Sequence, residues 1–74
     1  MSEAHYRRAQ KLLARNIRRL REAIGFTQED AAHASGIAVR HYQKLEAGDL
    51  NVTLRTLTKV AKGLRCELSD LFAE

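Results

Sequence analysis

The residues whose types could act together chemically are concentrated between Val39 and Lys44. Gln43 and Lys44 follow Arg40 by three and four residues, so both share a face with it if this stretch is helical. An arginine fork can donate to O6 and N7 of guanine, and a lysine can reach a guanine or a phosphate. Gln43 can donate and accept, as adenine requires, and Val39 offers apolar contact to a thymine methyl. The chemistry available here is recognition of base edges, although an ordinary exposed helix face could have the same composition.

Catalysis and metal binding have little support in the residue types. We find no nucleophile paired with a base, no paired carboxylates and no glycine loop suited to a phosphate. Cys66 is the single cysteine, so the chain can form neither an internal disulfide nor a metal site built on a cysteine pair. We therefore expect no enzyme activity, no metal and no cofactor. A small buried hydrophobe is the expected role of Cys66, and a redox-sensing thiol is the alternative.

The charge distribution points to an acidic partner. The chain has a net charge of +4, and residues 1–24 carry seven basic and two acidic side chains. Nucleic acid is the commonest partner of such a segment, although a solvated basic helix face would look the same. No apolar run approaches the ~18 residues of a membrane span, and no secretory signal is present. A lone thiol suits a reducing compartment, so we expect a cytoplasmic protein without membrane contact.

Helical patterns cover the whole chain. The first runs from about Ala4 to Ile24 with an apolar stripe at steps of three or four, and Gly25 ends it. Thr27, followed by Asp30, has the spacing of a capping box and opens a short helix that ends at Ser35-Gly36.

Two more helices and a terminal turn complete the pattern. One helix reads Val39 to Ala47, and Thr53 caps the next, whose stripe ends at Leu64. A last turn at about Leu68 to Phe72 brings the total to five, so we expect an all-α domain over residues 1–74. Glycine in the four-residue turn before Val39 is typical of a helix-turn-helix, here over residues 27–47. Residues 1–11 would be an N-terminal helical extension.

The runs TQEDAAHASGIAVRHYQKLEAG, NVTLRTLTKVAKGL and ELSDLF resemble the Cro/repressor family of helix-turn-helix regulators. That family includes phage repressors, restriction–modification controller proteins and many antitoxins. The similarity extends from about Leu13 to Phe72 and leaves residues 1–11 outside. It implies a compact five-helix Cro/repressor-like fold, from bacteria or phage, whose second and third helices form the DNA-binding motif.

The resemblance also implies roles for individual residues. Positions of base contact and nearby phosphate contact in the family fall on Val39, Arg40, Gln43 and Lys44. For the DNA backbone we expect phosphate contacts from Thr27, Gln28, His41 and Asn51. Gln28 would also steady the recognition helix. Arg21 and Glu46 match a family ion pair, and the alternative is two unrelated surface charges.

Some residues depart from the family's pattern. Ala31 stands where leucine is usual and Tyr42 where isoleucine or valine is usual, so we expect the two to face each other with compensating volumes. Ala38 replaces a serine or threonine cap, which should weaken the start of the recognition helix by about 1 kcal/mol. Arg65 replaces a glycine, which puts the geometry of the last turn in question, and Cys66 replaces a valine.

The function implied by the resemblance is sequence-specific regulation of transcription. A homodimer would place its two helices 39–47 in successive major grooves of a roughly palindromic site on double-stranded DNA. We expect the dimer surface at the C-terminal end, at Leu68, Leu71 and Phe72, with the N-terminal extension as the alternative. A second hypothesis is an antitoxin or adaptor that mainly binds a protein partner through residues 1–11.

Overall fold

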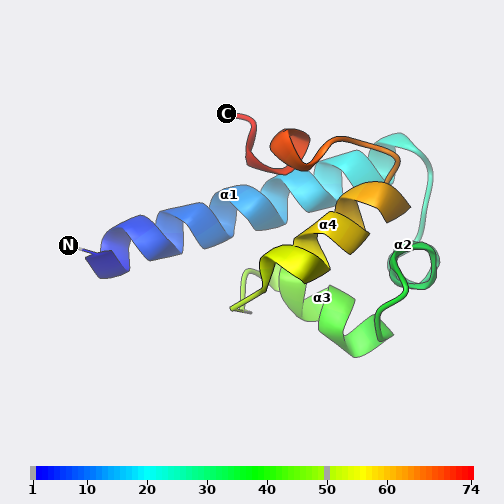
Figure 1. The fold of residues 1–74 in the computed structure, drawn as a ribbon, viewed down its shortest axis with the longest axis horizontal. Helices are drawn as coiled ribbons and strands as arrows, with labels where there is room; N and C mark the ends of the chain where they lie inside the picture. The colour runs from blue at the N-terminus through cyan, green and yellow to red at the C-terminus, as the bar shows by residue number, and fades with distance from the viewer. Residues whose placement is uncertain (1, 50) are drawn as a thin grey trace.

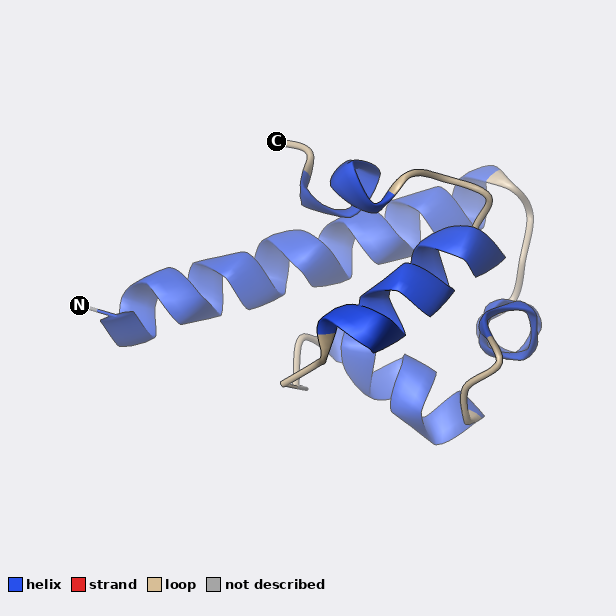
Figure 2. Ribbon diagram, viewed as in Figure 1, coloured by secondary structure: helices blue, strands red, loops and turns tan. Residues whose placement is uncertain are grey.

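The computed structural model describes residues 2–49 and 51–74. These residues form four α-helices and one 3-10 helix, with no strand among them (Figures 1 and 2). The elements in order are α1 (Ser2–Ala23), α2 (Gln28–Ser35), α3 (Val39–Ala47), α4 (Leu54–Gly63) and η1 (Leu68–Phe72). The all-α class predicted from the sequence is confirmed. None of the described helices is long and apolar enough to cross a membrane.

The prediction of five helices was wrong, because the last element is a 3-10 turn rather than an α-helix. Its first bond runs from the Asp70 N–H to the carbonyl of Glu67 over 2.9 Å, a three-residue step. The Asp70 carboxylate accepts the Glu67 N–H at 2.9 Å and tightens the same turn. A five-residue segment closed by three-residue steps suits the tighter 3-10 geometry.

Arg65, which precedes this turn, has a φ of 61° and is the one described non-glycine residue with positive φ. A glycine would adopt this left-handed conformation without strain. For an arginine, the same conformation costs roughly 1–2 kcal/mol. Its guanidinium carbon lies 5.4 Å from the centre of the Phe26 ring, and this cation–π contact offsets part of the strain. The chain therefore retains the turn despite the missing glycine.

Caps define both ends of the short helix α2. The Thr27 hydroxyl accepts the Asp30 N–H at 3.0 Å, and the Asp30 carboxylate accepts the Thr27 N–H at 3.0 Å. This is the capping box that the spacing predicted. Gly36 ends α2 with a φ of 71°, in the left-handed region where glycine meets no steric penalty. The chain then turns and begins α3 at Val39.

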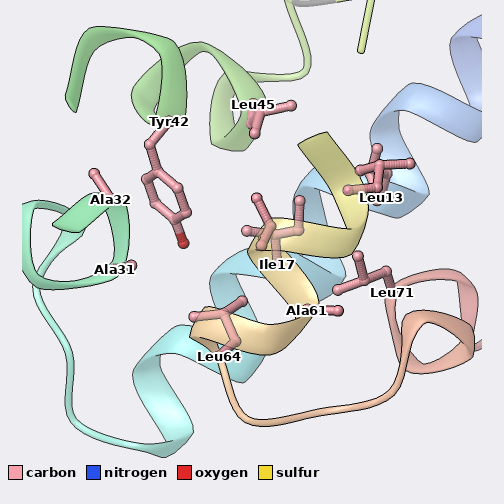
Figure 3. Close-up of a cluster of buried hydrophobic side chains, with 11 residues drawn as sticks. Leu13, Ile17, Ala31, Ala32, Tyr42, Leu45, Ala61, Leu64 and Leu71 are labelled. Carbon is pink, nitrogen blue, oxygen red and sulfur yellow. The ribbon is translucent and has the colours of Figure 1, made fainter. Parts of the chain in front are cut away.

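The core lies between α1, α3, α4 and η1, and the small side chains of α2 cover one side of it (Figure 3). The largest fully buried side chains are those of Tyr42, Ile17, Leu64, Leu71 and Val60. Figure 3 shows the Tyr42 ring reaching from α3 to lie beside Ala31 and Ala32 of α2. Ala31 and Tyr42 are both fully buried, so the large ring occupies the space that the alanine leaves.

Close approach of α2 to α4 depends on one glycine. A Cβ atom on Gly63 would lie 2.5 Å from the Ser35 Oγ and 2.8 Å from the Ser35 amide nitrogen. Real Cβ atoms do not come this close to other atoms, so any larger residue would push the two helices apart. By contrast, Glu3 to Ala9 are all exposed, and the first turns of α1 project past the other helices (Figure 1).

Candidate nucleic-acid interface

Helix α3 has one outward and one inward face. Val39, Arg40, Gln43 and Lys44, the four candidates for base contact, are all exposed. On the opposite side, Tyr42, Leu45 and Glu46 are buried. The structure therefore brings the four candidates together on one solvent-facing surface of a helix whose other side is anchored in the core.

An ion pair anchors α3 to α1. The Arg21 guanidinium donates to Glu46 through Nε at 2.6 Å and Nη2 at 3.1 Å, a two-point contact. The side chains are 13% and 2% exposed, so the pair is largely shielded from water. Burial alone would raise the pKa of Glu46, but hydrogen bonds from Arg21 and Gln28 outweigh it and lower that pKa. The hydrogen bond to Glu46 likewise raises the pKa of Arg21.

Gln28 connects the start of α2 to α3. Its amide nitrogen donates to Glu46 Oε1 at 3.0 Å, and its amide oxygen accepts from Gln43 at 3.4 Å. The first residue of α2 thus contacts both the buried and the exposed face of α3. This geometry agrees with the steadying role that the resemblance implied for Gln28.

A second anchor of α3, Arg18, was not among the site residues predicted from the sequence. Its guanidinium donates to the backbone carbonyl of Glu46 at 3.1 Å, at the C-terminal end of α3. A cation at this end satisfies a carbonyl that lacks a helical partner and complements the helix dipole. The available signal was its helical spacing, three residues before Arg21, the arginine that the resemblance already singled out.

The four candidates for phosphate contact do not form one cluster. Thr27 and Gln28 lie together at the start of α2, where Thr27 is exposed and Gln28 half-buried. His41 is half-buried and lines an open hollow with Ala38, Arg40 and Lys44 on α3. Asn51 is exposed in the loop before α4 and borders a hollow at the N-terminal half of α1.

Comparison with known proteins places this architecture. A helix-turn-helix family model matches residues 17–71. The chain belongs to the helix-turn-helix family. The resemblance inferred from the sequence is thereby confirmed. The family is one of transcriptional regulators and not of enzymes.

Individual members of the family are similar over most of the chain. An uncharacterized HTH-type transcriptional regulator of Sinorhizobium fredii is 39% identical over 54 residues, which cover 73% of this chain and 70% of that protein. The restriction–modification controller protein C.AhdI from Aeromonas hydrophila superposes with a TM-score of 0.82 and 33% identity, over 85% of this chain and 96% of that one. An HTH_3 family transcriptional regulator from Vibrio cholerae gives a TM-score of 0.86 at 25% identity, over 90% of this chain but 38% of its own.

One of the three candidates for a dimer surface is excluded by burial. Leu71 is 0% exposed in the isolated chain, so its side chain cannot contact a second copy. Leu68 is half-buried against the core, and Phe72 is 43% exposed. Phe72 borders the same hollow as Tyr6 of α1, so the C-terminal and N-terminal candidate surfaces meet there.

Cys66 is half-buried against the core. Burial raises the pKa of its thiol, and the nearby carboxylates of Asp70 and Glu67 raise it further. A raised pKa keeps the thiol protonated and unreactive. These surroundings suit the small hydrophobe expected at this position better than a redox sensor.

Proposed function

We propose that this chain is a sequence-specific transcriptional regulator that reads double-stranded DNA with α3. The motif would span residues 27–47. The single observation that carries the proposal is the exposure of Val39, Arg40, Gln43 and Lys44 together on the outer face of α3. A major groove about 12 Å wide admits one α-helix, and these side chain types match the groups displayed there.

Each of these four side chains can contact a particular group on the base edges. Arg40 would donate to O6 and N7 of a guanine, and Lys44 would reach a guanine or a phosphate one turn later. Gln43 would pair with an adenine and Val39 would contact a thymine methyl. The Gln43 amide is positioned by its contact with Gln28, so its orientation is partly set before DNA binds.

Backbone contacts would fix the register of α3 in the groove. An amide NH₂ group has two hydrogens, so Gln28 can donate one to Glu46 and keep the other for a phosphate oxygen. Thr27, at the same helix start, lies beside backbone N–H groups that favour an anion. His41 and Asn51 would contact phosphates from α3 and from the loop before α4.

The functional unit would be a homodimer on a roughly palindromic operator. One α3 has four candidate side chains for base contact, and each well-made contact favours the correct base over a wrong one by about 1–3 kcal/mol. Two copies would place their α3 helices about 34 Å apart in successive major grooves and double the bases read. The exposed Phe72 at the hollow between α1 and the C-terminal end supports an interface there.

The test is selection of bound duplexes from a random pool at one stated salt concentration. The proposal predicts enrichment of sites with two half-sites. Arg40→Ala should lose its preference at one base pair of each half-site, with a penalty of about 1–3 kcal/mol. The matched control Lys59→Ala removes one exposed cation from α4 and should select the same sequence as the wild type. An unchanged sequence for Arg40→Ala would count against the reading role of α3.

An antitoxin or adaptor remains a second candidate because the first turns of α1 project and lie outside the matched region. That function predicts a protein partner held by residues 1–11. Deleting residues 2–11 would then leave operator binding unchanged while abolishing capture of the partner. Weak, purely salt-dependent DNA binding without enrichment of any sequence would favour this second function.

A further inference from the structure

The outward face of α1 carries six cations: Arg7, Arg8, Lys11, Arg15, Arg18 and Arg19. Successive residues of an α-helix are about 100° apart around its axis. On that basis, Arg7, Lys11 and Arg18 lie within about 40° of one another and form an inner row. Arg8, Arg15 and Arg19 form an outer row on the adjoining part of the helix surface.

The fold itself does not account for four of these charges. Among the described residues, no carboxylate oxygen lies within 4.0 Å of Arg7, Arg8, Lys11 or Arg15. Lys11 has Arg7 four residues before it and Arg15 four residues after it. Like charges at this spacing destabilise a helix by roughly 0.2–0.5 kcal/mol per pair. Cations that repel one another and have no carboxylate partner indicate that this exposed surface binds an anionic partner.

The inner row adjoins the C-terminal end of α3. Arg18 donates to the Glu46 carbonyl there at 3.1 Å while its side chain remains 54% exposed. Arg7 and Lys11 border an open hollow whose other wall is Ala47, Gly48 and Asp49. The helix that carries this row extends beyond the other helices toward its N-terminus (Figure 1).

The outer row faces a different part of the molecule. Arg8 and Arg15 line a hollow with Lys11, Leu12 and the C-terminal Glu74, and no residue of α3 borders it. The two rows have the same kinds of side chain on the same helix, but only the inner one adjoins the candidate reading helix. This difference provides a matched internal control.

We propose that the inner row of α1 binds phosphates of the DNA backbone that flanks the base pairs read by α3. The inference rests on the proposed function, because α3 in a major groove would bring duplex DNA to this edge of α1. Backbone phosphates border the groove on both sides, so an element beside the end of α3 meets a line of anions. Arg7 and Lys11 are separated by a rise of about 6 Å along the helix axis, and their long side chains span several phosphate positions.

The experiment compares two double variants that lose the same charge. Arg7→Gln with Lys11→Gln removes part of the inner row, and Arg8→Gln with Arg15→Gln removes part of the outer row. Glutamine has nearly the helix propensity of arginine and lysine, and matching melting temperatures will show that folding is retained. Binding is measured over a range of salt concentrations, on the selected operator and on a random duplex.

Loss of two phosphate contacts should reduce the slope of log K against log salt by about 1.8 for the inner-row variant. The outer-row variant should keep nearly the wild-type slope. Trimming the flanking base pairs should weaken binding of the wild type and leave the inner-row variant unaffected. Equal slopes for the two variants on both duplexes would overturn the inference, including the case in which α1 binds an acidic protein instead.

Failure of this inference and failure of the proposed function give different results. If α3 does not read sequence, the selection yields no consensus, whereas the salt slopes on random duplex still compare the two rows. If the inner row does not touch DNA, the consensus persists and the difference between the two variants disappears.

Discussion

At the scale of single residues, Glu46 is notable because its side chain is 2% exposed and its carboxylate joins α3 to both α1 and α2. Arg21 of α1 and Gln28 of α2 both donate to it, and Arg18 donates to its backbone carbonyl. Removing a charge from water is costly, so a buried ion pair adds little stability compared with apolar residues of the same size. Its two-point hydrogen bonding does, however, fix the relative position of the helices that carry the two partners. Glu46 therefore sets the position of α3 relative to the rest of the chain.

Loss of the Glu46 carboxylate should destabilise the protein because it leaves the largely buried Arg21 guanidinium with only a distant carboxylate, that of the exposed Glu22 at 3.9 Å. We expect Glu46→Ala to lower the free energy of unfolding by about 3 kcal/mol. Glu29→Ala, at an exposed position of α2, should lower it less. Urea denaturation of both variants measures the difference, and equal losses would show that the pair does not hold α3.

The same carboxylate predicts a dependence on pH. The pKa of Glu46 is lowered in the folded chain from a usual value of 4.5, so folding favours its charged form. Its contribution is complete above that value and is lost as the pH falls through the lower, folded pKa. The stability difference between wild type and Glu46→Gln should therefore shrink between neutral pH and about pH 3. Denaturation at several pH values checks this, and a difference that grows on acidification would contradict it.

At the scale of elements, α3 begins without a side-chain cap. Ala38 has a φ of −64° and a ψ of 144°, the extended geometry of a cap residue, but its methyl group cannot accept a hydrogen bond. Ala38→Ser should therefore stabilise the protein by about 1 kcal/mol. Thr53→Ala, which removes the cap of α4, should have the opposite sign. Thermal unfolding of both variants measures these changes in stability. If Ala38→Ser destabilises the protein, the space around position 38 matters more than the missing cap.

The packing of α2 against α3 gives a second prediction at this scale. Ala31 and Tyr42 are both 0% exposed and lie side by side, so leucine at position 31 would overfill the space. Ala31→Leu alone should cost about 1–3 kcal/mol. Adding Tyr42→Ile should recover part of that loss, because it removes the volume of the ring that lies beside Ala31. Free energies of unfolding for the single and double variants test this, and a less stable double variant would refute compensation.

Local signals explain how much of these elements could be predicted. Thr27 and Gly48 act within a few residues of the helix ends that they define, so the start of α2 and the end of α3 follow from the sequence. A turn at Leu68–Phe72 was also predictable, but its 3-10 form was not, because apolar spacing does not distinguish the two helix types over five residues. The Arg21–Glu46 contact entered through the resemblance, since two charges 25 residues apart carry no local signal.

At the scale of the whole molecule, a long-range contact closes the fold. The Asn16 side chain in the middle of α1 donates to the carbonyl of Leu71 at 3.0 Å and to that of Ala73 at 2.8 Å. Asn16 is itself buried, so these bonds satisfy an amide that would otherwise be costly to place in the core. They hold the C-terminal segment against α1 and turn Leu71 inward. No sequence pattern linked Asn16 to the C-terminus, so the sequence could not show that Leu71, expected to be shared between core and interface, is fully buried in the core.

The neighbours Leu71 and Phe72 should therefore behave in opposite ways. Leu71→Ala opens a cavity in the core and should cost about 2–5 kcal/mol at any protein concentration. Phe72→Ala removes a ring that is 43% exposed beside Tyr6, so it should cost less stability and instead weaken association of two copies. Sedimentation equilibrium, with melting temperatures measured over a range of protein concentrations, separates the two effects. If the Phe72 variant associates as the wild type does, the homodimer must use another surface, and the half-site spacing from the DNA selection then constrains where it lies.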